Sequence, residues 1–308
     1  MRKMKLSTPK IEEKDHCPRV SVCCITYNHV HFIARALDGI LNQEIDFTME
    51  VLIYDDMSSD GTREIVERYS KLHPDIIKTL LPEENQYSKG VNTMAKLRET
   101  ASGKYIAFCE GDDFWTDPTK LQKQVSFLEQ NPRVVITGHK VIAVDIKGQP
   151  VRYFKSRNPF AANPHERDYT AEELRTLPVI IPTSSRVFRN IQLKMPLEAK
   201  KTIAGDAFLQ VLLSEHGDYK YIDSIKPSYY MISDAGIWSQ QSRDTEILQQ
   251  SNLLTQLRLY LERQGYTNES GELYRQQSWL FIELLALRLL TKLGLKSFLK
   301  TLKGKIFH

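Results

Sequence analysis

Short β-rich runs alternate with segments of helical periodicity in the first third of the chain, and this alternation constrains the fold more than any other feature. Four apolar runs predict strands, at residues 20–26, 50–55, 76–81 and 104–109. Between them apolar residues recur three and four positions apart, as at Ile33, Leu37 and Ile40, which predicts a helix in each connection. This order is typical of parallel strands joined by crossover helices, so we expect an α/β fold with a mostly parallel sheet.

The rest of the chain gives less regular signals. Asp117 and Pro118 predict a helix start, because a capping carboxylate and a proline in the first position both favour one. A strand is expected at 134–144, a capping box at 170–173 and helix from about Thr245 to the end. We therefore expect an N-terminal tail, one α/β domain and a helical C-terminal extension, at residues 1–18, 19–240 and 241–308.

Composition and charge narrow the class of protein. Apolar residues make up 41% of the 308 residues and charged residues 26%, which indicates a globular chain. Residues 1–19 carry six basic and three acidic groups, and residues 288–308 carry six basic and no acidic groups. The net charge of the whole chain is only +4, so the body between these ends is acidic. Nucleic-acid-binding domains usually carry a basic stripe, so we expect no nucleic acid partner.

The cysteines and the ends of the chain bear on its location. The four cysteines are Cys17, Cys23, Cys24 and Cys109, with no C-x-x-C pair, and three of them lie in apolar runs. Buried free thiols in a reducing compartment are therefore expected. No apolar stretch follows the basic N-terminus, so no signal peptide is predicted. The most apolar segment, 279–290, is interrupted by Glu283 and Arg288 and is shorter than the ~20 residues that span a bilayer. We therefore expect a cytoplasmic protein.

Polar residues follow three of the predicted strands, where ligands bind in open parallel sheets. These segments are Thr26 to Asn28, Asp55 to Thr62 and Glu110 to Asp113. Several carboxylates would converge there, which is costly unless a cation or a hydrogen-bonding ligand compensates their charge. The chain has no G-x-G and no G-x-x-x-x-G-K-[ST], so the common glycine-rich nucleotide loops are absent. A phosphate ligand would therefore be held through a carboxylate-bound Mg²⁺ or Mn²⁺.

The motifs in this region resemble those of family 2 inverting glycosyltransferases of the GT-A fold. The segments that carry the resemblance are 20–28, 51–62, 85–90, 105–118 and 120–124. They cover about residues 19–135 in the order and spacing of that family, and weaker similarity continues from Gly205 to Trp238. The resemblance implies that residues 19–135 bind a nucleotide-sugar and that residues 136–240 contribute the acceptor half.

The resemblance also implies roles for single residues. Thr26 and Asp56 match positions that hold the base and ribose of the donor. Asp112, in Glu110-Gly111-Asp112, matches the metal-binding end of a D-x-D motif. Asp206 matches the carboxylate that activates the acceptor. The donor-binding residues implied by the whole pattern are Thr26, Tyr27, Asn28, Asp55, Asp56, Asn85, Lys89, Gly90, Glu110 and Gly111.

The chain departs from the family pattern at two places. Relatives often have Tyr-Arg-x-His here, and this sequence has Met231 and Ser233 in place of the Arg and the His. If that His helps to hold metal or phosphate, its replacement would lower metal affinity or activity. Glu110 replaces the first Asp of the D-x-D motif, and its longer side chain still offers a carboxylate.

Each candidate residue also has a structural interpretation. Asp55, Ser58 and Asp60 could end a strand and cap a helix, and Asp206 could be a helix cap. Asp56 gains nothing structurally from standing beside another carboxylate, which favours a functional role. His29 and His31 are better explained by a solvated helix start than by metal binding. Trp115 and Trp238 could stack on a sugar, but closing the core with an aromatic side chain is favoured.

The pattern as a whole predicts a metal-dependent inverting glycosyltransferase. By resemblance, it would use a nucleotide-diphosphate sugar, first of all a UDP-sugar, and a saccharide or lipid-linked saccharide acceptor in bacterial surface polysaccharide synthesis. One alternative is a nucleotidyltransferase that makes an activated sugar, although residues 28–32 lack the glycine-rich basic loop that it would need. Another is a catalytically impaired nucleotide-sugar-binding protein.

The basic C-terminal end has a further predicted partner. Apolar residues there share one helical face and lysines line the adjacent one, a pattern that suits an anionic membrane surface. The apolar positions are Leu295, Phe298, Leu299, Leu302 and Ile306, and the basic ones are Lys292, Lys296, Lys300 and Lys303. A helix packed on the catalytic domain is the alternative. Membrane docking would place the protein at the inner face of the cell membrane.

Overall fold

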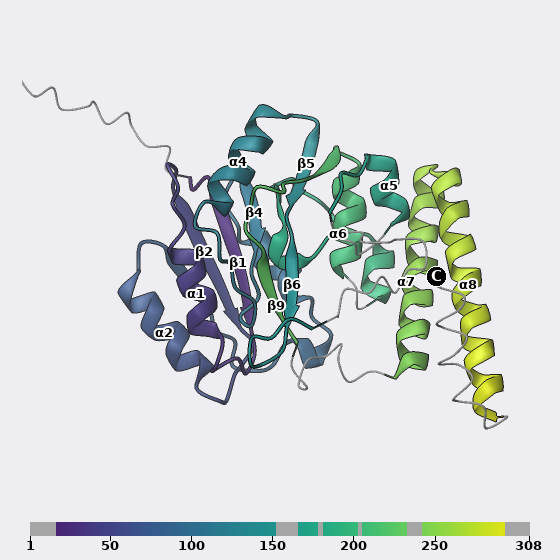
Figure 1. The fold of residues 1–308 in the computed structure, drawn as a ribbon, viewed down its shortest axis with the longest axis horizontal. Helices are drawn as coiled ribbons and strands as arrows, with labels where there is room; N and C mark the ends of the chain where they lie inside the picture. Colours follow the sequence, from purple (N-terminus) through teal and green to yellow (C-terminus); the bar gives the residue numbers. More distant parts are fainter. Residues whose placement is uncertain (1–16, 152–165, 178–180, 203–204, 233–241, 293–308) are drawn as a thin grey trace, which may run out of the picture.

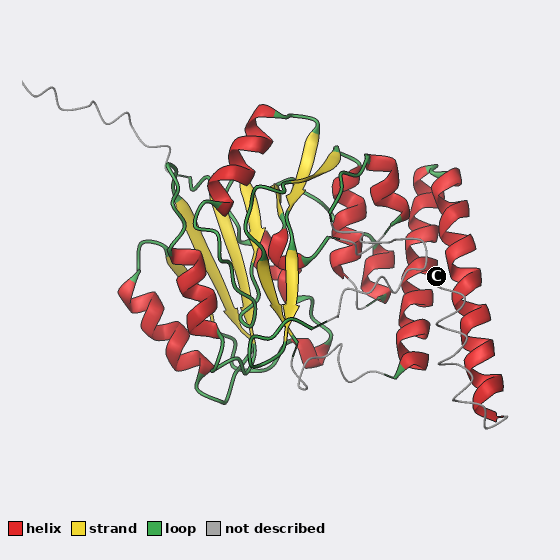
Figure 2. Ribbon diagram, in the orientation of Figure 1, coloured by secondary structure: helices red, strands yellow, loops and turns green. Residues whose placement is uncertain are grey.

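The computed structural model describes residues 17–151, 166–177, 181–202, 205–232 and 242–292. Within these ranges a central sheet carries helices on both faces, and two long helices lie at one end of the molecule (Figure 1). Figure 2 shows the same view by secondary structure, with strands in the middle and helices around them. The expected α/β architecture with a helical C-terminal extension is therefore confirmed.

The first half of the sheet consists of the four strands that the sequence predicts. They are β1 (Val20–Thr26), β2 (Met49–Asp55), β3 (Ile77–Leu80) and β4 (Tyr105–Phe108). They lie parallel in the order β3-β2-β1-β4. The connections contain α1 (Ile33–Leu41), α2 (Thr62–Leu72), the 3-10 helix η1 (Tyr87–Lys89) and α3 (Thr93–Glu99). Because these strands share one direction, the carboxyl ends of β1, β2 and β4 meet at one edge.

The second half of the sheet contains one reversal of direction. β7 (Val187–Arg189) lies antiparallel between β4 and β5 (Val134–Gly138). At the edge, β8 (Asp218–Tyr221) runs parallel to β5. A separate parallel pair is formed by β6 (Val141–Val144) and β9 (Ser228–Met231).

The prediction of one strand at 134–144 is wrong, because the chain leaves one sheet and enters another within this segment. β5 ends at Gly138, where an added Cβ would lie 2.5 Å from the hydroxyl of Tyr219. The next residue, His139, is fully buried, and its Nε2 lies 2.7 Å from the hydroxyl of Ser228 in β9. Apolar residues occupy both short strands, so hydrophobic periodicity does not reveal the break between them.

The remaining helices of the domain are α4 (Lys120–Gln130), α5 (Ala171–Thr176) and α6 (Gly205–Ser214), with the 3-10 helices η2 (Thr183–Ser185) and η3 (Leu197–Lys201). The predicted capping box is confirmed, since Thr170 and Glu173 each accept the other's backbone N–H. The predicted start of α4 is two residues too early. Asp117 does not cap the helix itself; its carboxylate accepts the N–H of Thr119 at 2.9 Å in the preceding turn.

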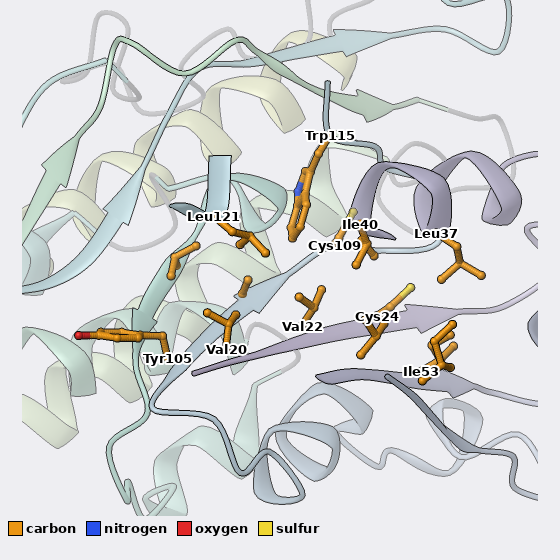
Figure 3. Close-up of a cluster of buried hydrophobic side chains, with 14 of the residues drawn as sticks. Val20, Val22, Cys24, Leu37, Ile40, Ile53, Tyr105, Cys109, Trp115 and Leu121 are labelled. Carbon is orange, nitrogen blue, oxygen red and sulfur yellow. The ribbon is translucent and has the colours of Figure 1, made fainter. Parts of the chain in front are cut away.

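The sheet is buried on both faces. On one face, α1, α2 and α4 pack against β1 and its neighbours through the cluster of apolar side chains in Figure 3. On the other face, α3, α5 and α6 contribute Leu97, Leu174 and Leu209 to a second cluster. Trp115 belongs to the first cluster with 4% of its surface exposed, so its predicted role in closing the core is confirmed. Trp238 lies outside the described residues.

Three of the four cysteines are buried, as predicted, and all four thiols are free. Burial raises the pKa of the Cys23, Cys24 and Cys109 thiols above the ordinary value. Since the thiolate is the reactive form, these three side chains act as small apolar residues of the core. Cys17 is exposed instead.

The C-terminal extension is an antiparallel hairpin of two helices. α7 (Arg243–Gln264) ends at Gly265, whose φ of +89° suits glycine, and α8 (Thr267–Lys292) runs back along it. Leu257 and Leu273 of the hairpin pack against Phe208 of α6 in a third apolar cluster. The helix predicted from Thr245 is therefore confirmed as far as Lys292, whereas residues 293–308 lie outside the described ranges. None of the helices described is long and apolar enough to cross a membrane.

A buried carboxylate ties the strands together at the edge opposite the candidate site. Glu50, at the start of β2, has 4% of its surface exposed. Its carboxylate accepts hydrogen bonds from Ser21 Oγ at 2.6 Å, from Ser102 N–H at 2.9 Å and from Lys78 Nζ at 2.7 Å. Burial by itself would raise the pKa of Glu50, but these hydrogen bonds outweigh it and the pKa lies below the ordinary value of 4.5.

We expect Glu50→Gln to lower the free energy of unfolding by about 1–3 kcal/mol at pH 7, because an ionic acceptor of several hydrogen bonds is lost. Since the pKa is depressed in the folded state, this stabilisation is complete above the ordinary value of 4.5 and is lost as the pH falls through the lower folded-state value. Urea denaturation of both proteins between pH 7 and pH 3 measures it. Glu44→Gln, at an exposed position, is the control. A difference that stays constant with pH would contradict this account.

Candidate functional site

Four carboxylates converge at the carboxyl edge of the parallel strands. Glu110, Asp112 and Asp113 follow β4, and Asp206 lies in the first turn of α6. The charge of Asp112 acts on both Glu110 and Asp113, and the charge of Asp206 acts on Glu110. The carboxylates after β4 are therefore joined by one from α6, far along the chain, whereas Asp55, Asp56 and Asp60 after β2 are held by the other contacts described below.

The charges of this cluster are not balanced by the protein. Burial is the largest cause that raises the pKa of Glu110 above its ordinary value, and the charges of Asp112 and Asp206 raise it further. The guanidinium of Arg186 lowers this pKa, but by less than the other groups raise it. Burial, with Asp112 and Glu110, likewise raises the pKa of Asp113. Both shifts express the cost of bringing like charges together in a region of low dielectric. A bound cation would relieve that cost.

Asp112 has an oxygen that makes no hydrogen bond. Its Oδ2 lies 3.7 Å from Nε2 of His29, while its buried Oδ1 has no partner. Buried Nδ1 of His29 and buried Oγ1 of Thr26 are unpartnered as well. Buried polar groups are normally hydrogen-bonded, so these three atoms mark a place where a ligand would supply the missing contacts. The sequence had favoured a solvated helix start for His29, and only its position just after β1 hinted at the site.

Gly111 is required by the close approach of two strand ends. Its N–H donates to the carbonyl of Ile25 at 2.8 Å. An added Cβ would lie 2.5 Å from Oγ1 of Thr26 and 3.0 Å from Nδ1 of His29. Only glycine lets the backbone after β4 approach β1 this closely, so Glu110 and Asp112 reach the site on either side of a residue without a side chain.

The turn after β2 is held mainly by structural contacts. Asp55 is fully buried and its Oδ2 lies 2.8 Å from Nε of Arg63. Asn28 has a φ of +55°, and its Oδ1 accepts the N–H of Ser59 at 2.9 Å. Asp60 accepts the N–H groups of Val30 and Thr62. These contacts favour the structural interpretation of Asp55 and Asp60 and extend it to Asn28. Tyr27, beside them, is about half exposed.

The expectation that Asp56 gains nothing structurally is wrong. Its two carboxylate oxygens accept the N–H of Gln86 at 2.7 Å and the N–H of Tyr87 at 3.0 Å. Its carbonyl accepts Nδ2 of Asn85 at 2.9 Å. Asp56 therefore anchors segment 85–90 beside the strand ends. Within that segment Lys89 pairs with Glu84, and Gly90 ends η1 with a φ of +75°.

Asp206 is paired with an arginine that the sequence did not single out. The Asp206 side chain is 36% exposed, and its Oδ2 lies 3.7 Å from Nη2 of Arg186. Arg186 is 2% exposed, and its Nε donates to the carbonyl of Ile181 at 2.7 Å. It comes just before β7, the antiparallel strand, and no local pattern marks this residue as part of a site.

Gly205 allows a close approach between the start of α6 and Asn92. An added Cβ there would lie 2.2 Å from Nδ2 of Asn92. The Asn92 side chain caps α3 by accepting the N–H of Ala95 at 2.9 Å. Gly205 thus allows the starts of α6 and α3 to touch, which places Asp206 near the strand ends.

Met231 stands where the family pattern often has Arg, and it lies at the same site. Its N–H donates to Oδ1 of Asp113 at 3.2 Å, and its side chain lines a cavity with Asp112 and Phe114. Ser233 lies outside the described residues.

The residues present fit a metal that substrate helps to hold. In the described ranges, no group of three or more His, Cys, Asp and Glu is arranged to enclose a metal ion. Asp112, with its unpartnered Oδ1, offers one carboxylate. Mg²⁺ typically uses one or two carboxylates together with substrate phosphates, so an incomplete protein site is the expected form.

A sequence model of the glycosyl transferase family 2 matches residues 21–191. This match covers more than half of the chain, and it contains every strand end of the site. The protein therefore belongs to glycosyl transferase family 2.

Curated relatives are similar over the same region. An uncharacterised protein of Mycobacterium tuberculosis is 40% identical over 123 residues, which are 40% of this chain and 35% of that protein. A putative teichuronic acid biosynthesis glycosyltransferase of Bacillus subtilis is 35% identical over 138 residues, 44% and 52% of the two chains. The UDP-Glc:alpha-D-GlcNAc-diphosphoundecaprenol beta-1,3-glucosyltransferase of Escherichia coli is 37% identical over 116 residues, 36% and 42% of the two chains. The chain thus spans between about a third and a half of these relatives.

Solved structures share the fold. A mannosyltransferase from Pyrobaculum calidifontis, in complex with GDP-Man and Mn²⁺, aligns with a TM-score of 0.58 and 18% identity, over 97% of this chain and 84% of that one. Residues 1–349 of TarS from S. aureus, in complex with UDP-GlcNAc, align with a TM-score of 0.52 and 18% identity, over 77% and 66%. The expected GT-A fold is thereby confirmed.

Proposed function

We propose that this protein is an inverting glycosyltransferase that moves a sugar from a nucleotide-diphosphate sugar to an acceptor hydroxyl. The observation that carries the proposal is the convergence of Glu110, Asp112 and Asp206 at the strand ends of a family 2 domain, with an unpartnered oxygen on Asp112. A UDP-sugar is the preferred donor, because the Escherichia coli relative is named for UDP-Glc and the S. aureus neighbour holds UDP-GlcNAc.

The donor would lie across the ends of β1, β2 and β4. Thr26 offers a buried, unpartnered hydroxyl to the nucleoside, and exposed Tyr27 offers an aromatic face for the base. Asp56 acts by holding segment 85–90 in place, and Asn28 and Asp55 do the same for the turn after β2. Asp112, with Glu110 nearby, would hold Mn²⁺ or Mg²⁺. When bound, such an ion offsets the charge that develops on the departing diphosphate.

The acceptor would be activated by Asp206. A hydroxyl is too weakly acidic to attack unaided, so a carboxylate must accept its proton as the anomeric carbon gains positive charge. Asp206 is on α6, apart from the β4 loop that carries Asp112, and its carboxylate is partly exposed beside Arg186. A base on this side suits inversion in a single displacement.

A saccharide or lipid-linked saccharide of bacterial surface polysaccharides is the proposed acceptor. The names of the Bacillus subtilis and Escherichia coli relatives, which mention teichuronic acid and a diphosphoundecaprenol acceptor, support this class. The nucleotidyltransferase alternative has less support, because the segment after β1 is fixed by Asn28 and Asp60 and is not a glycine-rich phosphate loop. Turnover separates an enzyme from a protein that only binds the donor.

We further propose peripheral contact with the inner face of the membrane through the C-terminal extension. Large apolar side chains on α8 are exposed and recur at helical spacing along one face. They are Tyr274, Phe281, Ile282, Leu285 and Leu289, each between 48% and 61% exposed. The basic segment 288–308 overlaps the end of this face. Apolar side chains beside lysines suit an anionic lipid surface.

We expect binding of a nucleotide-sugar to require a divalent cation and to be abolished in Asp112→Ala, because clustered carboxylates repel a diphosphate. Calorimetry with a panel of UDP-, GDP- and TDP-sugars, in Mn²⁺, Mg²⁺ or chelator, tests this, and nucleotide release with candidate acceptors tests turnover. Asp75→Ala, at an exposed carboxylate before β3, is the control. Undiminished affinity in chelator or in the Asp112 variant would remove the metal from the proposed function.

We expect Asp206→Asn to lower turnover by roughly 10²–10⁴-fold, the usual contribution of a positioned general base, and to leave donor affinity within severalfold. Steady-state kinetics and donor titration measure the two effects separately, with the exposed Asp46→Asn as control. Turnover near the wild-type rate would make Asp206 a helix cap, and loss of donor affinity would assign it to the metal site.

We expect the protein to float with liposomes that contain anionic lipid, and to do so less after deletion of residues 291–308 or in the double variant Leu285→Gln, Leu289→Gln. Leu72→Gln, which alters an equally exposed leucine on α2, should float as the wild type does. Equal flotation of all forms would reject membrane contact by this extension.

A further inference from the structure

A cavity of about 180 Å³ opens beside Asp112, on the side of the site formed by α1 and by the turn after β6. It would hold several water molecules at roughly 30 Å³ each, so a small polar group fits inside. Among the residues around it are Arg35, Asp112, Phe114, Lys147 and Gly148.

Arg35 is fixed over the cavity by aromatic contacts. Its guanidinium lies 3.4 Å from the centre of the Phe114 ring, and Phe114 is stacked on Tyr229 with 4.9 Å between ring centres. The Arg35 side chain makes no hydrogen bond or ion pair with another residue that the structure describes. Its five N–H donors remain available in a fixed plane, because a cation–π contact holds the guanidinium without using them.

Lys147 brings a second cation to the lining of the cavity. It stands in a tight turn, where Asp145 Oδ1 accepts the N–H of Lys147 at 2.9 Å and Gly148 takes a φ of +75°. The ammonium of Lys147 forms no ion pair with the described residues. The turn therefore fixes the backbone of Lys147 at the rim while leaving the side chain free to reach a ligand.

The charges around the cavity select an anion. Arg35 and Lys147 carry two positive charges against the single carboxylate of Asp112, and a cation on Asp112 would increase the imbalance. A group that can share oxygens between a metal ion and a planar guanidinium is required. Phosphate meets both needs, since its oxygens bind divalent cations and accept paired N–H donors of arginine.

We propose that Arg35 and Lys147 bind a phosphate group of the substrate in this cavity, next to Asp112. The phosphate belongs either to the donor diphosphate or to a phosphate carried by the acceptor. This inference rests on the proposed function insofar as Asp112 faces the donor. It adds two specificity-determining residues, one on α1 and one after β6, that no motif of the sequence had indicated.

Inorganic pyrophosphate is a probe that contains neither base nor sugar. We expect calorimetry to show pyrophosphate binding about 10- to 100-fold weaker in Arg35→Gln than in wild type, the usual effect of losing hydrogen bonds to a charged group. Lys147→Gln should weaken it less. The matched control is Arg68→Gln, because Arg68 also lies over an aromatic ring, Tyr69, but on α2. Thermal unfolding verifies that each variant is folded.

The source of the phosphate follows from kinetics with the full chain. A raised KM for the nucleotide-sugar in Arg35→Gln, with an unchanged KM for the acceptor, assigns the cavity to the donor diphosphate. The reverse result assigns it to an acceptor phosphate. Pyrophosphate affinity and both KM values equal to those of Arg68→Gln would overturn the proposal. If the wild type transfers no sugar but Arg35→Gln still loses pyrophosphate affinity, the proposed function fails and the phosphate cavity stands.

Discussion

The parallel pairing of β1 with both β2 and β4 is the constraint on which the site depends. This register sets Thr26 beside Asp55 and Cys23 beside Phe108, so that the three strand ends and their loops open at one edge. The approach is close enough that only glycine fits at 111. Shifting one strand would separate Thr26 from Asp112 and bury or expose the wrong side chains, since alternate residues point to opposite faces.

Two glutamates show that a negative charge meets different surroundings at the two ends of the sheet. Glu50, at the amino ends, accepts hydrogen bonds from Ser21, Ser102 and Lys78, and its pKa is lowered. Glu110 lies at the carboxyl ends of the strands. Loss of solvent around its carboxylate and the nearby charges of Asp112 and Asp206 raise its pKa. The first environment is complete and stabilises the fold. The second is unbalanced, and pKa values perturbed in this way are typical of functional sites.

Hydrophobic patterns in the sequence predicted those helices and strands whose buried faces follow the periodicity of their own residues. Both ends of β1 were predicted correctly, because its short apolar run is bounded by Pro18 and Asn28, residues typical of turns. The strand at 134–144 was misjudged, because the break after Gly138 arises from contacts with Tyr219 and with β9, which are distant in sequence. The structural work of Asp56 was missed for the same reason, since the N–H groups that it anchors lie 30 and 31 residues further along.

The sequence by itself determined the α/β order, the family and the polar residues that follow β1, β2 and β4, among them the carboxylates after β2 and β4, because motif spacing and periodicity are local properties of the chain. Only the tertiary structure decided which groups surround those carboxylates. Arg186 arrives just before an antiparallel strand, His29 lies near Asp112, and Arg35 lies over the ring of Phe114 beside a cavity. Such contacts depend on packing between elements far apart in sequence, and no local pattern encodes the distance between two side chains that meet only after folding.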